Sequence, residues 1–159
     1  MEHKLSTEEK IDFKNRLKQF CHATIERRIA SARESIATAQ SAANGEEKSS
    51  AGDKYETSRA MNHLEKDMHS RQLGEHLKEL AALHSIDTNT IYSSATMGAY
   101  LQCAKISFFF SAGLGKKMID GTPVLFLSHQ APLGKILHGK KAGDHFSFNG
   151  SNLIIEDIF

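Results

Sequence analysis

The stretch IERRIASARESIATAQSAA, residues 25–43, decides the fold of the first half of the chain. Apolar or small residues recur in it at alternating steps of four and three, which is the repeat of a helix with one apolar seam. The members of this seam are Ile25, Ile29, Ala32, Ile36, Ala39 and Ala43. The alanines among them allow close approach of a second helix, so we predict a helix over residues 7–43 that packs on a neighbour.

The predicted ends of this helix follow from local chemistry. Ser6 or Thr7 can cap it, and two glutamates follow in the first turn, where the helix dipole favours negative charge. Asn44-Gly45 is a natural stop because both residues tolerate the left-handed conformation.

A second helix is predicted from about Ser50 to His84, with Ser50 and Asp53 resembling a capping box. A linker of roughly six residues favours an antiparallel pair with the first helix. We expect the second helix to face the first through Thr57, Met61, Leu64 and Met68, and then through Leu73, Leu77 and Leu80.

Composition changes near residue 85, after which come both prolines and eight of the eleven glycines. Strand-like segments follow at 98–110, 123–128, 144–148 and 153–159, and Asn149-Gly150 is a strong hairpin-turn signal. Residues 132–138 read as a short helix with proline in its first turn. We predict an α+β protein with an antiparallel coiled-coil hairpin at 1–85 and a small antiparallel β domain at 86–159.

Three consecutive phenylalanines, Phe108, Phe109 and Phe110, lie in one predicted strand. Because neighbouring side chains of a strand point to opposite faces, we expect two of the rings in the core and one exposed, unless a bulge intervenes.

Two segments resemble the Gre family of bacterial transcript cleavage factors: AGDKYETSRA at 51–60 and APLGKILHGKKAGD at 131–144. In the first, Tyr55 and Arg59 match a tyrosine and an arginine that recur four residues apart in the family. The resemblance implies an N-terminal antiparallel coiled coil and a C-terminal FKBP-like β domain, and it covers nearly the whole chain.

The resemblance also implies a partner and a mode of action. In the family, the C-terminal domain docks at the rim of the RNA polymerase secondary channel and the hairpin enters the channel, near transcript and template. This implies docking through Pro132, Gly134, Lys135, Lys140, Lys141 and Asp144. The chain is then a regulator of elongation that has no catalytic residues of its own and is not an enzyme.

Family members carry acidic residues at the hairpin tip, which help to hold a magnesium ion at the polymerase active site. The corresponding positions here are Lys48 and Ala51, and neither side chain binds magnesium. We therefore expect weak or absent transcript cleavage. Glu46, Glu47 and Asp53 lie nearby and either replace the missing acids, sharing a magnesium ion with the polymerase, or serve only in solvation and capping.

Several classes of protein are disfavoured by composition. A net charge of +1 gives no general attraction to nucleic acid or membranes, and two distant cysteines do not make a disulfide framework. The first ten residues lack the apolar core of a signal peptide, so we expect a cytoplasmic protein without membrane contact. The histidines of the second helix are spaced by 6, 7 and 8, which is not metal-site spacing, so we expect no resident metal.

Two other functions remain open from sequence alone. One is a peptidyl-prolyl isomerase built on the β domain, although that domain has no tryptophan to line a deep aromatic pocket. The other is a coiled coil that pairs with another helical protein or with itself. We expect a monomer, with the apolar seam used within the chain.

Overall fold

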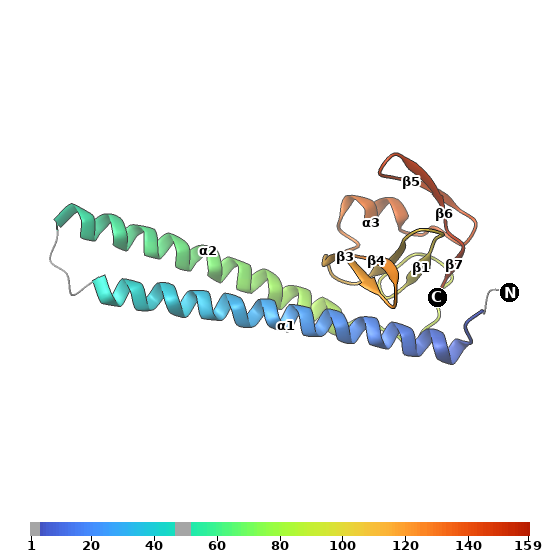
Figure 1. Cartoon of the computed structure of the whole chain (residues 1–159), viewed down its shortest axis with the longest axis horizontal. Helices are drawn as coiled ribbons and strands as arrows, with labels where there is room; N and C mark the ends of the chain where they lie inside the picture. The colour runs from blue at the N-terminus through green and yellow to red at the C-terminus, as the bar shows by residue number, and fades with distance from the viewer. Residues whose placement is uncertain (1–3, 47–51) are drawn as a thin grey trace. The chain divides into compact units, whose positions relative to one another are not determined.

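The structure is a computed structural model that describes residues 4–46 and 52–159, apart from the side chains of Glu46 and Asp53. It is α+β, as predicted: two N-terminal helices pack against each other and a mixed β-sheet region follows. The chain divides into two compact units, residues 1–22 with 82–159 and residues 23–81. Its elements, labelled in Figure 1, are α1 (Thr7–Glu46), α2 (Gly52–His84), β1 (Tyr100–Gln102), β2 (Ser107–Phe110), β3 (Gly115–Ile119), β4 (Thr122–Leu127), α3 (Pro132–Leu137), β5 (His145–Phe148), β6 (Ser151–Ile154) and β7 (Asp157–Ile158).

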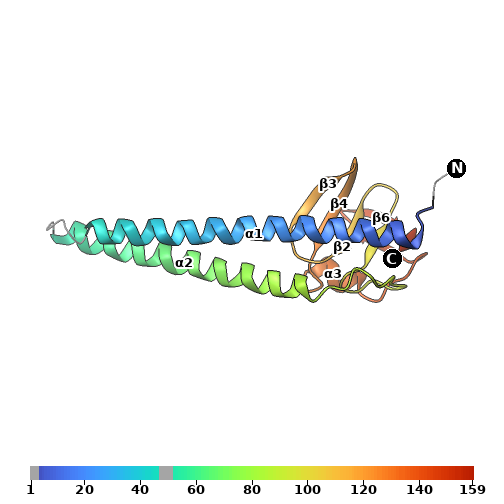
Figure 2. The same ribbon diagram turned by 90° about the horizontal axis from the view of Figure 1, so that it is seen from below.

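Within the unit of residues 23–81, α1 and α2 lie side by side in both views (Figures 1 and 2). Four of the six residues of the apolar seam predicted for α1, Ile25, Ile29, Ala32 and Ala39, are buried, and the other two are half-buried. Lys66 of α2 joins the two helices by donating a hydrogen bond from Nζ to Gln40 Oε1 at 2.7 Å.

The prediction of which face of α2 contacts α1 is wrong for the first half of α2. Met61, Leu64 and Met68 are all exposed, as is Leu77. The half-buried residues of α2 instead include Tyr55, Ser58, Asn62, Lys66, His69, Leu73, His76 and Leu80. These residues follow one another in steps of three and four, so they share one face of α2 with Leu73 and Leu80. That face turns inward although most of its residues in the first half of α2 are polar.

Ser6, one of the two residues predicted to cap α1, does so, and Glu9 adds a contact that was not predicted. Glu9 N–H donates to Ser6 Oγ at 3.2 Å and Ser6 N–H donates to Glu9 Oε2 at 2.7 Å, which is a reciprocal capping box. The predicted stop at Asn44-Gly45 is too early, because α1 continues to Glu46.

The five-stranded sheet has the order β3-β4-β2-β1-β7, and β5 pairs with β6 in a separate hairpin. The sheet is mixed and not wholly antiparallel as expected, because β2 and β4 run parallel from the Ser107–Val124 pair to the Phe110–Leu127 pair. The reason is the tight β3–β4 hairpin: β3 occupies the sheet edge, and β4 returns between β3 and β2. The expected single strand over 98–110 is also two strands, β1 and β2.

All three phenylalanines of β2 are buried, against the expectation that one ring is exposed. Both faces of this central strand are covered. Phe109 packs edge-on against Phe126, whose ring lies 5.3 Å from that of Phe20 in α1. On the other face, the ring of Phe108 lies 5.5 Å from those of the two phenylalanines of β5. Because both faces of the strand are covered, consecutive side chains can all be apolar and buried, and no alternation between apolar and polar residues is needed.

The hairpin predicted at Asn149-Gly150 is confirmed, since Phe148 and Ser151 face each other across it. Asn149 and Gly150 have φ values of 49° and 77°. Two consecutive residues with positive φ are typical of the tight hairpin turn that asparagine and glycine favour.

Candidate functional site

The short helix α3 is the centre of the candidate docking surface. Proline stands in its first turn, after Ala131 in extended conformation (φ −63°, ψ 151°), which suits the fixed φ of proline. Gly134 and Leu137 face inward and are buried. Pro132 and Lys135 are exposed, and Ile136 is 56% exposed. The helix therefore presents an apolar side chain next to a cation.

Gly134 has a structural role in holding α3 in place. A Cβ atom on this residue would lie 2.3 Å from the carbonyl oxygen of Ser128 and 3.0 Å from Cα of His129. Only glycine allows so close an approach between the helix and the backbone before it. The glycine of the predicted docking segment thus sets the position of the exposed residues around it.

The remaining residues that were predicted to dock lie in the turn after α3. Lys141 N–H donates to Asp144 Oδ2 at 2.8 Å, and Asp144 N–H donates to Lys141 O at 3.0 Å. Lys140 O accepts from the N–H of Ala95 at 2.8 Å, which ties this turn to the segment after α2. Asp144 therefore shapes the turn, whereas the side chain of Lys141 is exposed and Lys140 is half-buried.

The predicted hairpin-tip residues are only partly described. Glu47 lies outside the described residues, together with Lys48 and Ala51, and the side chains of Glu46 and Asp53 do too. Tyr55 is half-buried and Arg59 is exposed, one turn apart on α2. The expected role of the tip acids stays a prediction.

A lysine that the sequence did not single out fixes the segment after α2 to α1. Lys14 is completely buried, and its Nζ donates to Thr90 O at 2.7 Å and to Gly98 O at 3.0 Å. Burial lowers the pKa of Lys14 from 10.5 to about 8, and the charge of Asp87 opposes that shift. The ammonium also lies 4.7 Å from the ring centroid of Tyr92.

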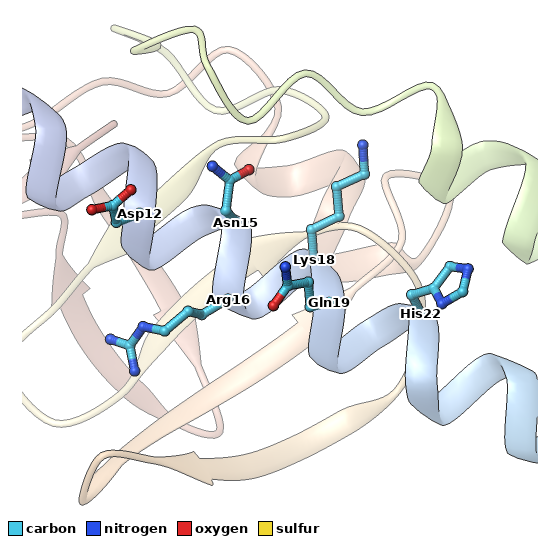
Figure 3. A pocket seen from close by; sticks show the side chains of 6 residues that line it. All are labelled: Asp12, Asn15, Arg16, Lys18, Gln19 and His22. Carbon is cyan, nitrogen blue, oxygen red and sulfur yellow. The ribbon is translucent and has the colours of Figure 1, made fainter.

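Neighbouring residues of α1 extend this attachment (Figure 3). Lys18 Nζ donates to Ile86 O at 2.7 Å, and Thr88 Oγ1 donates to Asn15 Oδ1. Arg16 points the other way and forms an ion pair with Asp120 at 2.9 Å in the β3–β4 turn. The signal in the sequence is that position 14 lies on the same helical face as Leu17 and Cys21, both of which are buried.

The same stretch of α1 lines an open surface hollow of about 790 Å³ (Figure 3). Its lining residues are Asp12, Asn15, Arg16, Lys18, Gln19 and His22. Three of these six side chains, those of Asn15, Arg16 and Lys18, already serve the contacts just described, so we assign the hollow a structural role in joining α1 to its neighbours.

Histidines and cysteines form no metal centre in the described part of the chain. Residues 4–46 and 52–159 hold no group of three histidines, cysteines, aspartates or glutamates that could bind a metal ion. Burial raises the pKa of the Cys21 thiol to about 11, opposed by its contact with Ser111 Oγ at 3.5 Å. Burial likewise raises the pKa of Cys103 to about 11, so neither thiol is an activated nucleophile.

Comparisons of this chain with protein-family models, curated proteins and solved structures found no match. No helix within residues 4–46 and 52–159 is long and apolar enough to cross a membrane.

Proposed function

We propose that this chain is a Gre-like regulator of transcription elongation that binds RNA polymerase through the surface around α3. The observation that carries the proposal is the arrangement of α3: Gly134 packs against the Ser128 carbonyl and so presents Lys135 and Ile136 outward. The same segment, 131–144, carries the specific part of the family resemblance.

The chemistry of this surface favours an acidic partner with an apolar centre. The segment from His129 to Lys141 contains three lysines and two histidines and no acidic residue. Ile136, 56% exposed, supplies an apolar contact within this positive field. Opposite charge on the partner would steer association, and burial of the isoleucine would stabilise the bound complex.

The proposal extends to the rest of the molecule. In this proposal the β domain has the FKBP-like fold, and the paired helices α1 and α2 form the coiled-coil hairpin that enters the secondary channel of the polymerase. The protein acts in the cytoplasm. The seam of α1, which is buried at Ile25, Ile29, Ala32 and Ala39, supports this assignment, since a probe needs helices that hold together along their length.

Binding to purified RNA polymerase of the source organism tests the proposal. We expect the full chain to bind, and the double variant Lys135→Glu, Lys141→Glu to bind at least tenfold more weakly, since both side chains are exposed and reversal of charge repels an acidic partner. The matched control is Lys116→Glu with Lys117→Glu on β3, where both lysines are also exposed. Equal loss in both variants, or no binding of the full chain, would contradict docking at α3.

Cleavage of the transcript in stalled elongation complexes tests the tip separately. Because Lys48 and Ala51 stand where the family has acids, we expect occupation of the channel with little cleavage. Strong Mg²⁺-dependent cleavage that disappears in Glu46→Ala with Glu47→Ala would show instead that these glutamates replace the family pair.

A further inference from the structure

An apolar stripe on α2 lies uncovered in the unit of residues 23–81. Met61, Leu64 and Met68 are 58%, 66% and 46% exposed. Steps of three and four place them on one face of the helix, so they form a continuous ridge and not three scattered residues. We name Met61, Leu64 and Met68 the methionine stripe.

The first helix does not cover this stripe, because α2 turns a different face toward α1. Asn62, one residue after Met61 and therefore about 100° around the helix, belongs to the half-buried set. Lys66, on the same side as Asn62, reaches α1 by its hydrogen bond to Gln40. The methionine stripe is thus free to meet another surface.

The charges beyond the ends of the stripe indicate which surface fits. Lys54 precedes the stripe and Glu75 follows it, both on the same side of α2 by helical spacing. The midpoint between Lys54 and Glu75 falls between Leu64 and Glu65, and so does the midpoint between Met61 and Met68. An antiparallel copy of the same helix, centred on that point, therefore sets Met61 against Met68 and Lys54 against Glu75.

We propose that the methionine stripe is a self-association site, at which α2 packs antiparallel on α2 of a second copy of this chain about a two-fold axis near Leu64. Such an isologous contact repeats every interaction twice, giving two Lys54–Glu75 ion pairs and two Met61–Met68 contacts. The contact runs about 32 Å along the helix, from residue 54 to residue 75 at 1.5 Å per residue.

The surrounding charges are compatible with this pairing. Within the described residues, Glu75 forms an ion pair with the exposed Lys78 of its own helix at 3.5 Å, and exposed pairs of this kind contribute little to stability. Glu65 and His69 both line the hollow between α1 and α2. The Glu65 side chain therefore lies on the α1 side of α2, away from the proposed two-fold axis.

The association should be weak and dependent on concentration. A standard stable interface uses about 20–30 residues from each partner, whereas the stripe and its flanking charges supply far fewer. We expect monomers at about 1 µM and a growing dimer fraction between roughly 10 µM and 1 mM.

Sedimentation velocity of the full chain over this range tests the proposal. Leu64→Lys should weaken dimerisation roughly 30-fold or more, because it places charges at the centre of the contact. The matched control is Met118→Lys, which changes a 63% exposed methionine on β3 and should leave association unchanged. A chain that stays monomeric to 1 mM, or equal effects of the two variants, would overturn the proposal and leave the stripe to another partner.

Two further sets of variants test the antiparallel register. Lys54→Glu and Glu75→Lys should each weaken the dimer roughly tenfold through the loss of two ion pairs, and the double variant should restore it. Met61→Cys mixed with Met68→Cys should form an intermolecular disulfide, whereas Met61→Cys alone should not, because its two copies lie about 10 Å apart along the axis. Cross-linking of Met61→Cys to itself, or no restoration by the double variant, would refute the antiparallel arrangement.

Discussion

Replacing Gly134 by alanine perturbs the packing of α3 by a single methyl group, and the structure sets the expected size of the effect. The new Cβ would lie 2.3 Å from the Ser128 carbonyl oxygen, where real contacts do not fall below 3.0 Å. That oxygen cannot retreat freely, since it accepts a hydrogen bond from Ala131 N–H at 3.1 Å. Overpacking of this kind costs about 1–3 kcal/mol, and the better helix propensity of alanine returns at most about 1 kcal/mol. We expect a net loss of about 1–2 kcal/mol in the free energy of unfolding.

Urea unfolding followed by circular dichroism measures this loss. The matched control is Gly113→Ala, because a Cβ there meets nothing within 4 Å, and its stability should stay within about 0.5 kcal/mol of wild type. A Gly134→Ala variant as stable as wild type would refute the reasoning. It would mean that α3 does not rest on the Ser128 backbone, and that the exposed positions of Lys135 and Ile136 are not fixed by this contact.

Three other expectations follow from the same structure. Because the pKa of Lys14 is lowered to about 8 in the folded state, between pH 8 and 10.5 the unfolded chain holds a proton that the folded chain has released. The stability of wild type relative to Lys14→Met should therefore rise with pH across that window in urea unfolding, and an unchanged difference would contradict the burial of this amine. Gly74→Ala should stabilise α2 by about 0.5–1 kcal/mol, since a Cβ there meets nothing within 4 Å; slower hydrogen exchange in α2 checks this, and faster exchange would refute it. Cys21, whose pKa is raised to about 11, should resist thiol reagents at pH 7.5 until urea unfolds the chain, whereas rapid labelling of the folded chain would show that it is accessible.

Local chemistry predicted much of the fold. The cap at Ser6, the seam of α1 and the turn at Asn149-Gly150 each depend on residues close in sequence. A pattern within one segment is enough to determine such features, because helix caps, helix faces and tight turns are formed by neighbours along the chain.

Features that depend on distant segments could not be predicted. The burial of all three rings of β2 requires α1 on one face of the sheet and the β5–β6 hairpin on the other. The parallel pairing of β2 with β4 is likewise a property of the assembled sheet. The inward face of α2 was ambiguous because both the methionine stripe and the set containing Asn62 and Leu73 follow helical spacing.

The candidate site divides in the same way. The short helix predicted over 132–138 is present as α3, Pro132–Leu137. The close contact that requires Gly134 is made with the carbonyl of Ser128, six residues earlier, and the helical pattern of the sequence does not indicate it. The burial of Lys14 could not be predicted, because lysine is rarely buried without hydrogen-bond acceptors. Its acceptors, the carbonyl groups of Thr90 and Gly98, lie far away in the sequence.

Site-specific photo-cross-linking tests the central proposal most directly. A photoreactive residue placed at Arg59, which is exposed on α2, would be activated in complexes of the full chain with RNA polymerase, and the joined peptides identified by mass spectrometry. If the hairpin enters the secondary channel, this position should cross-link to peptides that line the channel. These cross-links should be lost when Lys135 and Lys141, the proposed docking lysines, are changed to glutamate. Cross-links only to outer surfaces of the polymerase, or channel cross-links that persist in the charge-reversed variant, would contradict the proposal.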